Sequence, residues 1–139
     1  MWLFTSNGFF SVVERGPDGY LCVLSRDERD LMNLQDYLGE QFHKEIPIEQ
    51  TNSMELEPYG YSFRMLVEKK DFEKYLIQQV REVKYDNFTN YCQSEESAVA
   101  HRKSPSYFEG LSRIWKLVYE FCGSSKRDQI GFYEGEEPF

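Results

Sequence analysis

The sequence is poor in the residues on which common catalytic and metal sites depend. It has two histidines, His43 and His101, far apart and in polar stretches, and three cysteines with no Cys-x-x-Cys spacing. An odd number of cysteines without that spacing favours neither a disulfide framework nor a zinc site. We therefore predict two surface histidines, no catalytic residues, no metal centre and a reducing, cytoplasmic location.

Two further absences concern glycine loops and long apolar runs. Gly8, Gly16 and Gly19 match neither the dinucleotide-binding nor the P-loop spacing, so no cofactor is predicted. No run approaches the roughly 18 apolar residues that span a bilayer, and the N-terminus lacks the basic region and cleavage site of a signal peptide. We expect a soluble, unexported chain without a membrane partner.

Positive charge is also scarce. The chain has 16 Lys and Arg against 24 Asp and Glu, a formal net charge of −8. This balance argues against long nucleic acids, because neutralisation of phosphates by Lys and Arg supplies most of the affinity for them. A small anion is not excluded, since it needs only one local pocket of positive charge.

What is present is sufficient for one hydrophobic core. The chain has 139 residues, of which 40% are apolar and 17% aromatic, and this fits a single domain. We assign residues 1–123 to that domain and residues 124–139 to an acidic C-terminal tail.

Apolar runs, turn residues and capping residues predict the elements of the first sixty residues. Ser25 and Glu28 form a capping-box pattern, Gly39 is expected to end the helix that follows, and Pro47 confines its strand to a sheet edge. The predicted elements are a strand ending at Val13, a turn at 15–19, a strand at 20–24, a helix at 27–38, an edge strand at 44–50 and a loop at 49–60.

The second part of the chain is predicted to be mostly helical. Alternation over 61–67 places Tyr61, Phe63, Met65 and Val67 on one face of a strand. The remaining predictions are a helix at about 70–83, a polar irregular stretch at 93–104, and a helix at about 105–122 that Gly123 ends. This order predicts an α+β fold in which two to three helices pack on a small antiparallel sheet.

Residues 85–92, Tyr-Asp-Asn-Phe-Thr-Asn-Tyr-Cys, allow two interpretations. In the first, Phe88 or Tyr91 stacks on a base while Asn87 and Asn90 bind a base edge or ribose. In the second, Asp86 caps a short helix, the two asparagines satisfy backbone groups and the aromatic residues form a buried stripe. The residues by themselves favour the second interpretation.

Three arginines are candidates for binding phosphate groups. Arg64 lies within an apolar strand, Arg113 within an aromatic helix, and Arg26 at a helix N-terminus whose free amides favour anions. For each one taken singly, a salt bridge or a solvated surface arginine is the favoured interpretation. If these arginines lie beside residues 85–92 in the fold, they supply the phosphate-binding groups of a nucleotide pocket whose base and ribose contacts come from that segment.

Four stretches together carry a resemblance to a known family. They are "MWLFTSNGFFSVVE", "YSFRMLVEKKDF", "YDNFTNY" and "SRIWKLVYEF", and the resemblance covers roughly residues 1–121. They resemble a family of small bacterial and phage proteins that is similar to the phage Thoeris anti-defence proteins of the first type. The resemblance does not extend to 94–104 or to the tail.

The resemblance implies a phage-encoded sponge. Such a protein is an oligomer that binds a cyclic ADP-ribose-type signal in pockets between protomers and does not cleave it, so a host immune effector is deprived of its signal. The matching residue types here are Phe88, Asn87 or Asn90, and Arg113, with Arg102 as a further candidate.

Two other functions compete with this prediction. One is an acidic protein-interaction module that inhibits a basic host protein, whose mark would be carboxylates clustered on one face. The other is a small nucleotidase using Asp86 and a neighbouring acid, whose mark would be dependence on a divalent metal. We expect a non-enzymatic protein.

Overall fold

The computed structural model describes residues 1–51 and 60–130, with side chains as far as Cys122. Its strands form one five-stranded antiparallel sheet of order β1-β2-β3-β5-β4. The strands are β1 (Trp2–Thr5), β2 (Gly8–Val13), β3 (Tyr20–Ser25), β4 (Glu49–Gln50) and β5 (Phe63–Glu68). With the helices described below, they confirm the predicted α+β class.

The first predicted strand is wrong in one respect, because it is itself a hairpin. Thr5 pairs with Gly8, and the chain reverses at Ser6 and Asn7. The Thr5 hydroxyl donates to the Gly8 carbonyl and accepts the Asn7 N–H, which stabilises the turn. Ser and Asn are typical turn residues, but the apolar runs on both sides of Ser6 and Asn7 favoured one continuous strand.

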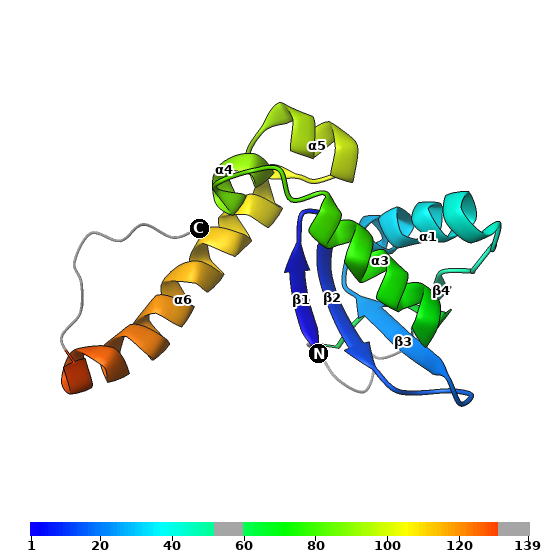
Figure 1. Cartoon of the computed structure of the whole chain (residues 1–139), viewed down its shortest axis with the longest axis horizontal. Helices are drawn as coiled ribbons and strands as arrows, with labels where there is room; N and C mark the ends of the chain where they lie inside the picture. The colour runs from blue at the N-terminus through cyan, green and yellow to red at the C-terminus, as the bar shows by residue number, and fades with distance from the viewer. Residues whose placement is uncertain (52–59, 131–139) are drawn as a thin grey trace.

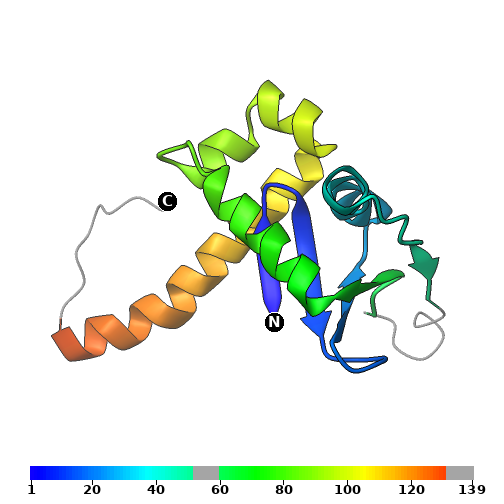
Figure 2. The ribbon, with the colours of Figure 1, turned by 45° about the vertical axis from the view of Figure 1, so that its right-hand side comes forward.

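Helices α1 (Glu28–Phe42) and α3 (Lys69–Arg81) cover one face of the sheet (Figures 1 and 2). Their apolar sides bury a cluster against the sheet, and Met65 and Val67 face this cluster as the alternation predicted. The fully buried members are Phe10, Val23, Leu31, Leu34, Leu38 and Met65, together with the nearly buried Val67, Phe72 and Tyr75.

The ends of α1 differ from the prediction. Its N-cap is Asp27, whose carboxylate accepts the Arg29 N–H, while Ser25 accepts the Asp27 N–H. The helix continues past Gly39 to Phe42, because Phe42 extends the apolar stripe onto the core. His43 then ends it in the left-handed conformation. The cost of one helical glycine, about 1 kcal/mol, is smaller than the gain from that packing.

The region predicted as irregular contains a helix. After α4 (Phe88–Cys92), α5 runs over Glu95–His101 with the Ser94 hydroxyl as its N-cap. The last helix, α6 (Pro105–Ile130), does not end at Gly123 as predicted. It extends away from the sheet and the other helices as an arm (Figures 1 and 2). Of the predicted loop at 49–60, residues 52–59 lie outside the described residues.

Among the described residues, no helix has both the length and the apolar composition needed to cross a membrane.

Candidate functional site

The predicted ligand-binding residues are spread over the described surface. Arg102 lines a cleft of about 530 Å³ between α1, α3 and α5, which we call the His101 cleft. Arg113 lines a cleft of about 640 Å³ between α5 and α6, the Arg113 cleft. Arg26 lines a smaller cleft of about 240 Å³ at the start of α1, the Arg26 cleft. Phe88 lines an apolar groove beside α3. One protomer therefore does not bring these four side chains together.

The segment 85–92 has the geometry of a helix cap and an aromatic cluster. The Asn87 side-chain oxygen accepts both the Asn90 N–H and the Thr89 hydroxyl, each at 2.9 Å. The rings of Tyr85 and Tyr91 stack with centroids 4.7 Å apart, and Phe88 lies 5.8 Å from Tyr85. These rings contact one another, but they are half-buried and do not form the buried stripe of the second interpretation, and Asn87, not Asp86, is the cap.

Two of the predicted arginines are already engaged with carboxylates. Arg64 Nε donates to Glu49 at 2.9 Å on the exposed face of the sheet. Arg102 donates to the Asp36 carboxylate at 2.8 Å and to the Asn33 side-chain oxygen at 2.9 Å. The Arg26 guanidinium lies 5.2 Å from the ring centroid of Tyr61. The salt bridge of Arg64 and the exposed position of Arg26 match the interpretation favoured for each of them taken singly.

The His101 cleft is built on a buried polar network. Asn7 donates through its side-chain nitrogen to the Tyr75 hydroxyl at 3.0 Å and to the Gln79 side-chain oxygen at 2.8 Å. Its oxygen therefore faces His101 Nδ1, at 2.6 Å, as the acceptor. The protonated Nδ1 leaves Nε2 to accept the Tyr91 hydroxyl at 3.1 Å.

The sequence prediction for His101 is wrong, because this residue is buried and not on the surface. Burial lowers the pKa of its imidazole, with nearby Lys103 acting in the same direction. Both ring nitrogens are bound by protein groups, so His101 joins α5 to the β1–β2 turn. His43, by contrast, is exposed as predicted.

We expect stability to depend on His101 in mildly acidic solution. Its folded-state pKa is lowered, so its contribution is complete above the unfolded-state pKa of about 6.5 and is lost as pH falls below that value. Urea unfolding between about pH 7.5 and about pH 5.5 measures the free energy of unfolding, and this free energy should change less with pH in His101→Gln than in wild type. His43→Gln should keep the wild-type slope. Equal slopes in all three proteins would contradict this role.

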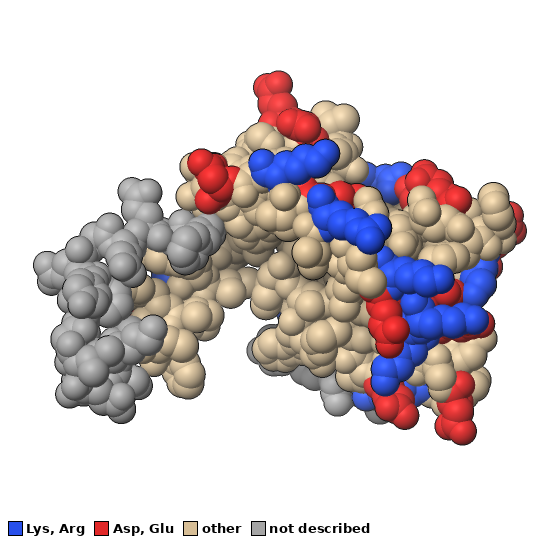
Figure 3. Space-filling view, viewed as in Figure 1, with Lys and Arg blue, Asp and Glu red and all other residues tan. Residues whose placement is uncertain are grey.

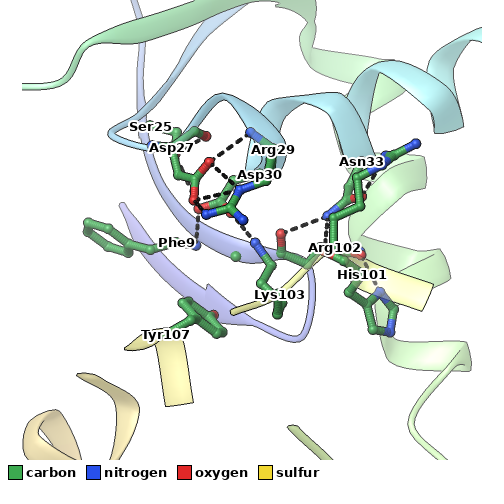
Figure 4. A network of polar contacts seen from close by, with 12 residues as sticks. Phe9, Ser25, Asp27, Arg29, Asp30, Asn33, His101, Arg102, Lys103 and Tyr107 are labelled. Carbon is green, nitrogen blue, oxygen red and sulfur yellow. Dashed lines mark hydrogen bonds and ion pairs between the residues drawn. The ribbon is translucent and has the colours of Figure 1, made fainter. Parts of the chain in front are cut away.

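The three consecutive residues 101–103 hold the α5 region to the body (Figure 4). Arg102 adopts the left-handed backbone conformation, with a φ of 55°. Among the described residues, His43, with a φ of 54°, is the other non-glycine residue in this conformation. This geometry sends His101 to the β1–β2 turn and Arg102 to α1, while Lys103 forms a buried ion pair with Asp30 of α1. Residues 101–103 therefore position both clefts beside α5.

Asp30 is the centre of this buried network. Its carboxylate accepts the Phe9 N–H at 3.1 Å and the Ser25 hydroxyl at 3.3 Å, besides pairing with Lys103. Burial raises the pKa of Asp30, and burial also lowers the pKa of Lys103. The carboxylate and the ammonium are thus used in holding the structure together, which reduces the free charge in the Arg26 cleft that both line.

The clefts differ in the charged residues that line them, and therefore in their suitability for binding an anion. The His101 cleft has two cationic residues, Lys84 and Arg102, against four acidic ones, which are Asp36, Glu40, Glu82 and Glu96. In the Arg26 cleft, Arg29 pairs with Asp27 at 2.7 Å and Lys103 with Asp30. The His101 cleft thus has an excess of acidic residues. The Arg26 cleft has three cations against two acids, but Arg29 and Lys103 are paired with carboxylates and Arg26 lies over the ring of Tyr61.

The Arg113 cleft differs in this respect. Arg113 and Lys116 lie three residues apart on the face of α6 that lines it, and within the described residues neither has an ion-pair partner. The cleft also holds an aromatic ring, hydroxyls and an amide, which belong to Phe108, Ser94, Ser112 and Gln93. Lys103, whose ammonium pairs with Asp30, also lines the cleft, and Glu95 and Glu109 are the acidic lining residues.

The described residues contain no group of three or more His, Cys, Asp or Glu side chains placed to hold a metal ion. Cys22 and Cys92 are buried, burial raises the pKa of the Cys92 thiol to about 11, and Cys122 is exposed on α6. A buried thiol with a raised pKa is a poor nucleophile.

Sequence reasoning missed three features of these clefts: α5, the burial of His101 and the position of Lys116 in the Arg113 cleft. The first had a usable signal, because Ser94 is followed by Glu95 and Glu96 and then by small residues, as at a helix start. The other two had none, since they depend on which distant residues pack nearby.

Comparison of the chain with protein-family models, with curated proteins and with solved structures gives no match.

Proposed function

We propose that the protein is a phage-encoded sponge that binds a small signalling nucleotide, of the cyclic ADP-ribose or cyclic oligonucleotide type, in the Arg113 cleft. The nucleotide is sequestered in the cytoplasm of the host and is not cleaved, so the immune effector is deprived of its signal. The observation that carries the proposal is the pair Arg113 and Lys116, two cations that have no carboxylate partner among the described residues and line a cleft that also contains an aromatic ring.

The two cations suit the phosphates of such a ligand. Arg113 offers a planar fork that binds a phosphate through two hydrogen bonds, and Lys116 offers a compact charge one helical turn away. Both side chains are exposed. They can therefore turn onto an anion without first breaking an ion pair, which would cost binding free energy.

The other lining groups suit a base and a sugar. Phe108 is half-buried at the junction of α5 and α6 and can stack on a planar base. The Gln93 amide and the Ser112 hydroxyl can donate to and accept from ribose or base edges. The volume of about 640 Å³ lies within the range of about 300–1,000 Å³ typical of small-molecule sites.

A thermal-shift titration tests the proposal. Purified protein is titrated with a panel of cyclic ADP-ribose isomers and cyclic di- and trinucleotides, then heated to release the ligand for chromatography. A ligand at a hundredfold over its dissociation constant should add about 2.7 kcal/mol to the free energy of unfolding. Recovery of the intact ligand would support sequestration, and a cleaved product would indicate a nucleotidase.

Substitutions in the cleft identify the site. Arg113→Ala and Lys116→Ala should each weaken binding about tenfold to a hundredfold, because each removes a charge-assisted contact to phosphate. The matched control is Arg81→Ala, which removes an exposed arginine from the last turn of α3. If no nucleotide shifts the melting temperature, or if Arg81→Ala is as damaging as Arg113→Ala, this site is wrong.

A specific observation favours one alternative, the acidic interaction module. Carboxylates gather around the His101 cleft and the neighbouring end of α1, and they belong to Asp36, Glu40, Glu45, Glu82 and Glu96. This is the clustering that such a module requires for a basic partner. It becomes the favoured function if the whole nucleotide panel fails.

A further inference from the structure

The arm formed by α6 leaves an apolar stripe uncovered. Ile114, Leu117, Val118 and Phe121 recur at helical spacing on one side of the helix, and we call them the arm stripe. Leu117 is 65% exposed and Phe121 is 80% exposed. The stripe continues in line from Leu111, which is buried against the body. One continuous apolar face is thus covered at its start and exposed farther out.

A helix of this kind needs a covering surface. Isolated helices are marginally stable in water, and helices in proteins gain most of their stability from packing an apolar face. The exposed stripe therefore indicates a packing partner.

The same chain carries a groove of matching chemistry. It has a volume of about 470 Å³ and runs between the β1–β2 turn, α3 and the start of α4; we call it the Val80 groove. None of its lining residues is Asp, Glu, Lys or Arg; they are Phe4, Thr5, Ser6, Leu76, Gln79, Val80, Val83, Tyr85 and Phe88. Val80 is 72% exposed, so the groove is as uncovered as the arm stripe.

The two apolar surfaces belong to one molecule but do not cover each other. Figure 3 shows a notch between the arm and the body, with a mostly uncharged surface on both of its sides. Charged side chains in that view gather over α3 and α5 instead. Near its base the arm is fixed, because the Tyr107 hydroxyl donates to the Thr5 carbonyl and Leu111 is buried.

We propose that a second copy of this chain occupies the groove, with each arm stripe packed into the Val80 groove of its partner. The absence of charge on both surfaces makes them electrostatically compatible, and insertion of an apolar helix face into a groove is a common mode of recognition. An exchange of arms about a twofold axis satisfies both copies at once and forms a closed dimer.

This dimer is independent of the proposed ligand. Arg113 and Lys116 lie on the face of α6 that lines the Arg113 cleft, whereas the centre of the arm stripe lies about 120° away on the helical wheel. The dimer can therefore form in the absence of any nucleotide. Loss of dimerisation and loss of nucleotide binding are thus separable results.

The first test is the oligomeric state in solution, measured by sedimentation equilibrium at micromolar concentrations. We expect a wild-type dimer and expect Phe121→Asp and Val80→Asp to be monomers, since each buries a charge in an apolar contact. Val99→Asp is the matched control, because Val99 is 84% exposed on α5 outside both surfaces. A monomeric wild type overturns the proposal, as does dissociation in the Val99 variant.

The second test distinguishes this arrangement from any other dimer. Mixing Phe121→Asp with Val80→Asp restores one intact arm and one intact groove, so heterodimers should form although neither variant self-associates. Cys122 is exposed on the arm while Cys22 and Cys92 are buried. In Val80→Cys, a short bismaleimide should therefore link Cys122 of one chain to position 80 of another. Dimers that neither complement nor cross-link would overturn the proposal.

Discussion

Replacement of Lys103 by methionine is expected to destabilise the protein by about 3–5 kcal/mol at neutral pH. The side chains of Lys103 and Asp30 are 2% and 6% exposed, and they form a buried ion pair. Methionine keeps most of the apolar volume but leaves the Asp30 carboxylate buried without its counter-ion. Breaking a buried pair in this way is costly, because the remaining charge has lost both water and its partner.

The pH dependence of the Lys103→Met variant gives a second readout. Without the ammonium, Asp30 should bind a proton more readily, and the neutral carboxyl costs less to bury. The difference in unfolding free energy between wild type and variant should therefore shrink as the pH is lowered. Adding Asp30→Asn to Lys103→Met should also recover part of the stability, because no unpaired charge remains.

The control is Lys70→Met. Lys70 pairs with Glu68 at 3.2 Å, but its side chain is 71% exposed, and exposed pairs contribute about 0–1 kcal/mol. Urea unfolding of the variants at one pH measures the difference. A cost for Lys103→Met no larger than that for Lys70→Met would show that the buried pair does not hold α5 to α1.

Gly8→Ala is expected to be of similar severity, at about 3 kcal/mol or more. Gly8 has φ of +137°, a conformation that residues with a Cβ rarely adopt. A Cβ at this position would also overlap the Asp30 carboxyl group. Asp30 cannot yield without loss, because Phe9, Ser25 and Lys103 all bind its carboxylate.

Gly19→Ala separates the backbone effect from the overlap. Gly19 also has a positive φ, of +83°, but a Cβ there meets no atom within 4 Å. Its substitution should cost only the conformational strain, about 1–2 kcal/mol. Thermal unfolding of both variants measures the difference. An equal loss of stability in the two variants would show that overlap with Asp30 does not contribute to the effect of Gly8→Ala.

The two large effects should not be additive. Gly8→Ala displaces the carboxylate that Lys103→Met leaves without a partner, so both substitutions damage the same ion pair. The double variant should therefore be less destabilised than the sum of the single variants. Full additivity in this cycle would mean that the Gly8 backbone and the Asp30 pair act independently.

Local pattern was sufficient for the parts of the fold that bury one apolar face. The alternation at Phe63, Met65 and Val67 and the leucine spacing in α1 predicted a strand and a helix that the structure contains. These patterns have the periods of a strand and of a helix, so neighbouring residues carry the information. The ends of the helices were less predictable from the sequence. Gly39 and Gly123 were expected to end their helices, but both lie within helices that continue beyond them.

The sequence by itself determined the α+β class, the absence of recognisable cofactor motifs and the candidacy of Arg113. Tertiary structure decided the rest. Lys103 and Asp30 are 73 residues apart, and His101 and Asn7 are 94 residues apart. Polar residues in a short irregular stretch are ordinarily exposed, and only the approach of a distant partner makes their burial favourable. Which arginines keep an unpaired charge is decided in the same way, because it depends on the carboxylates that folding brings beside them.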